Sequence, residues 1–206
     1  MYQPIHFQEN RPEVLHGLIS TQPLGLLISH GPAGLIANAI PFRLEEGGLK
    51  LTCHVARANS QWKELQQNPD CLVVFQGPQA YVSPGFYPSK AEHGKVVPTW
   101  NYIIVQARGR ASIIEDDEWL MGQVSALTQD HEATRPAPWA ASDAPDDFMK
   151  MQLRAIIGIE ITIQELSGKW KMSQNRNDAD RQGVIAGFED LARRDIADEV
   201  KKATGQ

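Results

Sequence analysis

The alternation of apolar and polar positions divides much of the chain into short strand-like runs separated by turn residues. Three such runs follow one another at 24–30 (LGLLISH), 34–42 (GLIANAIPF) and 48–56 (GLKLTCHVA). The clusters that separate them, at 31–34 and 45–48, are rich in glycine and read as hairpin loops. The pattern therefore predicts consecutive strands joined by tight turns in the first quarter of the chain.

Further apolar runs continue this pattern. Two short runs at 71–76 and 79–83 are joined by a Gly-Pro pair, and a longer run covers 100–114. The stretch 155–166 (AIIGIEITIQEL) is the strongest predicted strand in the chain. Between them, 84–98 is rich in Pro, Gly, Ser and Lys and predicts a long surface loop, a kind of segment that is often functional.

Helical periodicity is confined to a few segments. In the first, Asn10 is a good N-cap, Glu13 stands where a capping box needs it, and an apolar stripe runs to Gln22. The other predicted helices cover 59–68, 117–129 and 146–153, with a last one from about 178. Because strands outnumber helices and do not alternate with them, the sequence favours one mainly antiparallel barrel with helices at its ends, a single domain over 1–206.

Composition and charge narrow the class of protein. The chain has 206 residues, 42% of them hydrophobic, and its 20 basic and 25 acidic side chains give a net charge of −5. This balance disfavours a surface built to contact nucleic acid. No signal peptide and no membrane-spanning apolar run is visible, so we expect a cytoplasmic protein in which Cys53 and Cys71 are reduced.

Common catalytic and metal-binding patterns are missing from the sequence. There is no G-x-S-x-G, H-E-x-x-H, Walker A or G-x-G-x-x-G motif, and the six histidines have no metal-ligand spacing. The sequence therefore predicts no metal site and identifies no catalytic acid or base. These patterns do not decide whether the protein is an enzyme.

The first polar segment with potential chemistry is 54–62 (HVARANSQW), which leaves a strand and enters a helix. Backbone N–H groups, Arg57 and the small polar side chains of Asn59 and Ser60 converge there, a suitable place for a phosphate. The alternative is that Asn59 and Ser60 only cap the helix and that Arg57 is a solvated charge.

Two further segments could contact a planar ring. Aromatic residues in 83–90 and 97–102, together with Lys90, Thr99 and Asn101, could flank such a ring and bond its edge. The alternative is that Trp100 and Tyr102 are core residues of a strand. The segment 169–176 (KWKMSQNR) is rich in hydrogen-bonding side chains, and its alternative is a basic surface turn.

The whole chain resembles the PaiB-like family of FMN-binding negative transcriptional regulators. The matching pieces occur in order over nearly the full length: 1–7 (MYQPIHF), 54–62, 81–84 (YVSP), 87–90 (YPSK), 97–102 (VPTWNY), 157–161 (IGIEI) and 168–176 (GKWKMSQNR). The more distant pyridoxamine-phosphate oxidases are similar. They place Ser-Arg-Lys before a helix that runs into Glu-Leu-x-x-Asn-Pro; here Glu64 to Pro69 fits that ending, and Asn59-Ser60-Gln61 replaces the basic triplet.

The resemblance implies an FMN-binding split barrel, a six-stranded antiparallel Greek-key barrel with flanking helices, used as a homodimer with FMN at the subunit interface. Because the basic triplet is replaced, the resemblance implies that the negative charge of the phosphate is neutralised by Arg57, Lys90, Lys171 or Arg176. Thr99, Asn101 and the polar side chains of 173–175 would address the isoalloxazine edge. The expected cofactor-binding residues are His54, Arg57, Asn59, Ser60, Gln61, Lys90, Thr99, Trp100, Asn101, Lys171, Ser173, Gln174, Asn175 and Arg176.

Three functions follow from these observations. The first is a flavin-dependent redox or sensing protein that exchanges electrons with a small molecule or a nicotinamide cofactor. The second is a transcriptional regulator; direct DNA contact is disfavoured because the C-terminal helix mixes Arg193, Arg194, Lys201 and Lys202 with acidic residues. The third is a haem-binding member of the same fold, with His54 or His93 as the axial ligand.

Overall fold

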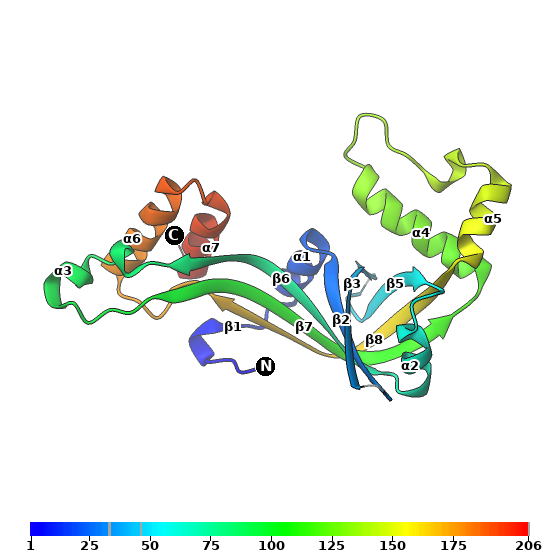
Figure 1. Cartoon of the computed structure of the whole chain (residues 1–206). Coiled ribbons are helices and arrows are strands. Elements are labelled where there is room, and N and C mark those ends of the chain that lie inside the picture. The colour runs from blue at the N-terminus through cyan, green and yellow to red at the C-terminus, as the bar shows by residue number, and fades with distance from the viewer. Residues whose placement is uncertain (33, 46, 206) are drawn as a thin grey trace. The chain divides into compact units, whose positions relative to one another are not determined.

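The computed structural model describes residues 1–32, 34–45 and 47–205, so Ala33 and Glu46 of the two predicted hairpin loops lie outside the described residues. The fold is mainly an eight-stranded sheet with flanking helices, in the order β3-β2-β6-β7-β8-β5-β4, with β1 paired to β8 (Figure 1). The strands are β1 (Gln8–Glu9), β2 (Leu24–Gly31), β3 (Gly34–Pro41), β4 (Arg43–Leu44), β5 (Lys50–Ala56), β6 (Asp70–Val82), β7 (Thr99–Ile114) and β8 (Ile156–Lys171). The predicted antiparallel class is confirmed, and two strands of two residues, β1 and β4, exceed the expected six.

Helices occur in every segment where the apolar periodicity predicts one, and a further short helix, α3, lies in the predicted loop 84–98. They are α1 (Pro12–Thr21), α2 (Gln61–Gln67), α3 (Ser89–His93), α4 (Asp117–Glu132), α5 (Asp146–Arg154), α6 (Asp178–Asp190) and α7 (Arg194–Thr204), with 3-10 turns at Ile5–Phe7, Pro84–Phe86 and Ala141–Asp143. The predicted capping box of the first helix is wrong. The backbone carbonyl of Arg11 accepts from the N–H groups of Val14 and Leu15, and Glu9 accepts from the N–H of Arg11, so the helix starts after Arg11.

Two predicted strand boundaries are also wrong. The break expected at Gly77-Pro78 does not occur, because β6 stays extended from Asp70 to Val82. The ladder between β2 and β6 ends at Val74, and a proline is tolerated where one edge of a strand lacks a partner. In the same way, β8 continues to Lys171, where β1 pairs with it at Gly168 and Lys169.

The segment 84–98 and the C-terminus differ from the prediction as well. Tyr87 and Ser89 are buried, and the backbone N–H and hydroxyl of Ser89 donate to the buried carboxylate of Asp180 on α6 at 3.1 and 2.8 Å. Part of the expected surface loop is therefore packed against a helix. The expected single C-terminal helix is two, α6 and α7, since Ala192 between them has a φ of 56°.

The chain divides into two compact units. The terminal unit comprises Met1–Leu15, Gln76–Val105 and Ser167–Gln206, and the inner unit comprises His16–Phe75 and Gln106–Leu166. The core of the inner unit is made by fully buried side chains that alternate along its strands: Leu27, Leu51, Cys53, Val73, Phe75, Ile157, Ile159 and Ile161. The core of the terminal unit joins strand residues to α6 and α7: Phe7, Val82, Ile103, Met172, Val184, Phe188 and Ile196.

Candidate functional site

The structure places the predicted residues of 54–61 in the inner unit, at the end of β5 and the start of α2. Gln61 is completely buried, and its amide is satisfied within the chain. Its Nε2 donates to the carbonyl of Leu27 at 3.0 Å and to Ser29 Oγ at 3.1 Å, while its Oε1 accepts from Asn38 Nδ2 at 2.9 Å. Gln61 therefore ties α2 to β2 and β3.

Asn59 and Ser60 stand at the N-terminus of the same seven-residue helix. Asn59 Oδ1 accepts from the backbone N–H of Gln61 at 3.0 Å, whereas Ser60 makes no side-chain capping bond. The capping interpretation is confirmed for Asn59. The helix is one of the shortest in the chain, so its dipole is small, and one of its free N–H groups is already occupied.

Arg57 and His54 also have partners from the inner unit. The guanidinium of Arg57 donates to Glu115 Oε2 at 2.6 Å and to the carbonyls of Arg154 and Ile156 at 2.9 and 3.4 Å. His54 Nδ1 lies 2.7 Å from Gln123 Oε1 on α4. The positive charge of Arg57 is thus compensated by a carboxylate.

Lys171 occupies a different environment at the end of β8 in the terminal unit. Its ammonium donates to Thr99 Oγ1 at 2.6 Å and to the carbonyl of Trp100 at 2.5 Å. Burial lowers the pKa of Lys171 below its ordinary value, and the positive charges of Lys169 and Arg176 lower it further. The structure therefore brings together three of the expected site residues, Lys171, Thr99 and Trp100, around a cation with neutral partners.

Asn101 and Ser173 meet in the core of the terminal unit. Asn101 is fully buried, and its amide exchanges 3.1 Å hydrogen bonds with the hydroxyl of Ser173, whose φ is 63°. Gln174 closes the same turn, because its Nε2 donates to the carbonyl of Trp170 at 2.6 Å and its Oε1 accepts from the N–H of Met172 at 2.7 Å. These three side chains shape the turn that follows β8.

The remaining predicted residues of the terminal unit are more accessible. Trp100 is 53% exposed and meets Tyr81 edge to face, with ring centroids 6.0 Å apart, so the prediction that it could be a core residue is wrong. Arg176 is half-buried over the ring of Tyr87, 4.6 Å from its centroid. Lys90 and Asn175 are exposed.

Lys169 lies in the predicted segment 169–176 but is not among the expected cofactor-binding residues. This lysine is only 7% exposed, and its ammonium lies 5.4 Å from the ring of Tyr2 and 5.3 Å from that of Tyr102. The signal was present, because Lys169 and Lys171 are two residues apart and share one face if the strand continues through them. The prediction of a basic surface turn at this point is wrong, since both residues belong to β8.

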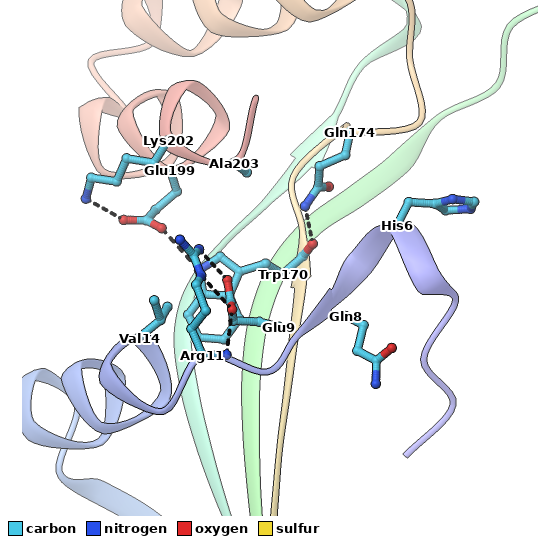
Figure 2. Close-up of a pocket in the computed structure, with 10 residues that line it drawn as sticks. All are labelled: His6, Gln8, Glu9, Arg11, Val14, Trp170, Gln174, Glu199, Lys202 and Ala203. Atoms are coloured by element: carbon cyan, nitrogen blue, oxygen red, sulfur yellow. Dashed lines mark hydrogen bonds and ion pairs between the residues drawn. The ribbon is translucent and has the colours of Figure 1, made fainter. Parts of the chain in front are cut away.

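The opposite face of the same stretch of β8 borders a cavity of about 570 Å³ (Figure 2). Trp170 faces it, together with residues of the N-terminal segment and α7. Its charged groups are paired: Arg11 binds Glu9 through two bonds of 2.9 and 2.6 Å, and Lys202 donates to Glu199 at 2.8 Å. Gln174 is the one predicted site residue that lines this cavity in the described part of the chain.

The described residues give no sign of a metal site or of a membrane-spanning helix. No three His, Cys, Asp or Glu side chains are grouped there so that they could hold a metal ion. No helix in this part of the chain is long and apolar enough to span a membrane.

Comparison with known sequences identifies relatives over most of the chain. Residues 1–165 match the model of a family described as "Putative FMN-binding domain". The chain is 30% identical over 187 residues to protease synthase and sporulation protein PAI 2 of Bacillus subtilis, covering 90% of this chain and 87% of that protein. It is 36% identical over 229 residues to protein AN0679 of Emericella nidulans, covering 93% and 91%.

Solved structures with the same fold are more distant in sequence. The FAD and heme binding protein from Mycobacterium smegmatis superposes with a TM-score of 0.62 at 20% identity, over 87% of this chain and 80% of that one. The flavocytochrome Anf3 from Azotobacter vinelandii superposes with a TM-score of 0.59 at 16% identity, over 80% and 69%. These likenesses support the split-barrel fold.

Proposed function

The chain belongs to the family of FMN-binding domains whose model its first 165 residues match, and from this premise we propose that it is a homodimeric flavoprotein with a redox or sensing role. Because the family is one of FMN-binding domains, FMN is the cofactor of this protein. In the proposal, residues 1–206 form one domain that works in the cytoplasm. When bound, FMN supplies electron transfer, and the chain supplies binding, orientation and electrostatics.

The observation that carries the proposal is the cation of Lys171, which forms no ion pair with a carboxylate among the residues that the structure describes. A flavin mononucleotide needs positive charge for its phosphate, polar groups for the ring edge and an aromatic or apolar surface for the ring face. Lys171 supplies the charge, Thr99 holds its ammonium in place, and the half-exposed indole of Trp100 supplies a surface. Asn175, exposed on the turn after β8, would bond the ring edge. The residues present therefore fit the cofactor.

The residues of the inner unit have a more indirect part in this proposal. To reach the phosphate, Arg57 would have to leave Glu115, and the N–H that Asn59 caps would have to be released. We therefore assign His54, Asn59 and Gln61 to positioning β5 and α2. The phosphate charge is assigned to the terminal unit. No residue is assigned as a catalytic acid or base.

An apolar face of the inner unit supports the proposed homodimer. β2 pairs with β3 and β6 so that Leu26 lies opposite Ala39 and Val74, and Ile28 lies opposite Ala37 and Leu72. Three leucines on this side are solvent-exposed: Leu24 (62%), Leu26 (40%) and Leu35 (77%). The rows of Leu26 and Ile28 contain no Lys, Arg, Asp or Glu, and a contiguous apolar face of this kind marks an interaction site. A second copy covers it best, because a two-fold contact uses the same patch twice.

Replacing the central leucine of this face tests the homodimer. In light scattering after gel filtration, we expect the wild-type chain to be a dimer and Leu26→Glu to be a monomer, because a charge cannot be buried unpaired in the contact. The matched control is Leu191→Glu, which changes an exposed leucine (62%) of the terminal unit. A Leu26→Glu protein that remains dimeric would place the interface elsewhere.

Flavin binding is tested first by absorption. The spectrum of the protein as purified separates flavin bands from haem bands in one measurement, which also decides the haem alternative. Titration of FMN into flavin-free protein should quench flavin fluorescence. A colourless protein that gives no quenching would remove the proposed function.

The C-terminal helices supply no observation in favour of direct DNA binding. Arg193 pairs with Asp195 at 2.8 Å, Lys201 with Glu189 at 2.6 Å and Lys202 with Glu199 at 2.8 Å. Regulation, in this proposal, acts through the flavin site. A gel-shift series at rising salt checks this point, because direct phosphate contact makes affinity fall steeply with salt.

A further inference from the structure

Three basic side chains stand near one another at the end of β8 without an acidic partner. Lys169, Lys171 and Arg176 take part in none of the ion pairs found among residues 1–32, 34–45 and 47–205. Lys169 is only 7% exposed, and a charged lysine is almost never buried to this degree without a counter-charge. The absence of a carboxylate therefore needs a physical reason.

Aromatic rings take the place of carboxylates around the two lysines. The ring of Tyr102 lies 5.3 Å from the ammonium of Lys169 and 6.0 Å from that of Lys171. Tyr2 adds a second ring to Lys169 at 5.4 Å, and Phe7 adds one to Lys171 at 5.9 Å. The negative ring faces attract both cations, but a ring replaces only part of the hydration that a buried ammonium loses.

The crowding of like charges also affects the pKa of Lys171. Its pKa is lowered first by burial and then by the charges of Lys169 and Arg176, and no carboxylate contributes. The folded chain thus holds two ammonium groups over one ring at an electrostatic cost. An anion bound between them would remove that cost.

Enough hydrogen-bond donors remain for an anion. Each ammonium has three N–H groups. Lys169 uses one of them on the carbonyl of Tyr2 at 3.2 Å, and Lys171 uses two, on Thr99 Oγ1 and the carbonyl of Trp100. Two donors on Lys169 and one on Lys171 are therefore left, and Lys171 is half-buried, so that its ammonium can be reached from solvent.

We propose that Lys169 and Lys171 form a binding pair for a phosphate monoester dianion, seated over the ring of Tyr102. The identity of the ester rests on the proposed function, in which it is the phosphate of FMN. Lys169 is the new member of the site, and both lysines act by direct charge-assisted hydrogen bonds to the phosphate oxygens.

Binding of inorganic phosphate to the flavin-free full chain tests the pair directly. By calorimetry at low salt, we expect each of Lys169→Met and Lys171→Met to weaken phosphate binding by about fivefold to tenfold, and the double variant by more. Methionine keeps the apolar stem, and circular dichroism checks the fold. The matched control is Lys63→Met, which removes an exposed lysine 5.4 Å from the ring of Trp62 and should leave binding unchanged. Wild-type affinity in the double variant would overturn the proposal.

A second measurement needs no variant. In protein labelled with ¹³C at the lysine ε-carbons, the pKa of Lys171 should rise when phosphate is added, because a neighbouring dianion favours the ammonium form. An unchanged titration of Lys171 at saturating phosphate would place the anion elsewhere and overturn the proposal.

Comparing FMN with riboflavin separates this inference from the proposed function. We expect FMN to bind at least about tenfold more tightly than riboflavin, and this preference to be lost in the double variant. Equal affinity of the wild type for both flavins would overturn the lysine pair and leave flavin binding intact. Phosphate binding at the lysines without any flavin binding would overturn the proposed function and support the pair.

Discussion

The basic residues of the two units differ in what they face. In the inner unit, Arg43 faces Glu45 at 2.5 Å, Lys50 faces Glu160 at 2.8 Å and Arg57 faces Glu115 at 2.6 Å. In the terminal unit, Lys169 and Lys171 face rings, a hydroxyl and carbonyl groups. Basic residues thus have two roles in this protein. A cation that is paired with a carboxylate stabilises the local structure, whereas a cation without a carboxylate can bind an anionic ligand.

The first prediction has the largest expected effect and tests whether the polar residues near the start of α2 stabilise the inner unit and do not bind the ligand. Gln61→Leu should reduce the free energy of unfolding by about 2–4 kcal/mol, because it leaves the carbonyl of Leu27 and the amide of Asn38 without their buried partner. The FMN affinity of the folded protein should not change. Chemical denaturation and flavin titration measure the two effects.

An exposed neighbour gives the control for this prediction. Gln66→Leu, on the outer side of α2, should alter the unfolding free energy by less than about 0.5 kcal/mol. If Gln61→Leu were stable and failed to bind FMN, Gln61 would face the ligand, and the contrast between the two units would not hold.

The second prediction compares one cation from each unit. Lys171→Met should weaken FMN binding at least about tenfold, which is about 1.4 kcal/mol or more, because it removes a charge that has no other use. Arg57→Met should weaken it by less than about threefold, since that guanidinium is already paired. Fluorescence quenching titrations at one ionic strength measure both values. A larger loss for Arg57→Met would reverse the assignment of the phosphate.

The fold was predictable because most of it follows from local alternation. β2, β3, β5 and β7 lie within two residues of the predicted runs, and more buried and more exposed positions alternate along β2, β3 and β7. The errors in the predicted strand boundaries occur where a segment distant in sequence supplies the hydrogen-bonding partners of a strand. β8 extends through Gly168 because the strand β1 pairs with it there, so closely that a Cβ at this position would lie 3.2 Å from the carbonyl oxygen of Glu9.

The candidate site was predictable only in part, for a similar reason. Residue type and order indicated Lys171 and Thr99, which are 72 residues apart and lie in contact. The pairing of Arg57 with Glu115 joins residues 58 positions apart, and no local pattern shows it. Lys169 fell inside the predicted segment 169–176 but outside the expected cofactor-binding residues, because its position depends on the ring of Tyr102 and on β8 continuing beyond its apolar part.

The third prediction uses pH to test whether Lys171 lacks an acidic partner. The pKa of Lys171 in the folded chain lies below its ordinary value of 10.5. Between these two values the unfolded chain binds more protons, so this residue makes stability rise with pH. The stability of the wild type relative to Lys171→Met should therefore increase toward pH 10.5, by less than about 1 kcal/mol because the group is half-exposed. A relative stability that falls over this range would mean that a carboxylate raises the pKa instead.

The smallest expected effect tests whether the pairing in the inner unit withholds charge from a ligand. Glu115→Gln removes the carboxylate of a pair in which Arg57 and Glu115 are 41% and 54% exposed, so stability should change by less than about 1 kcal/mol. Arg57 keeps its bonds to the carbonyls of Arg154 and Ile156, which hold the guanidinium in place.

FMN affinity decides what this variant means. If the phosphate binds at Lys169 and Lys171, the affinity of Glu115→Gln for FMN should equal that of the wild type within about twofold, since the freed charge has no ligand to bind. If its affinity rises severalfold, and the rise disappears when Arg57→Met is added, then the freed guanidinium contacts the phosphate. In that case the ion pair with Glu115 would compete with phosphate for the guanidinium of Arg57, and the paired cations of the inner unit could also contribute to ligand binding.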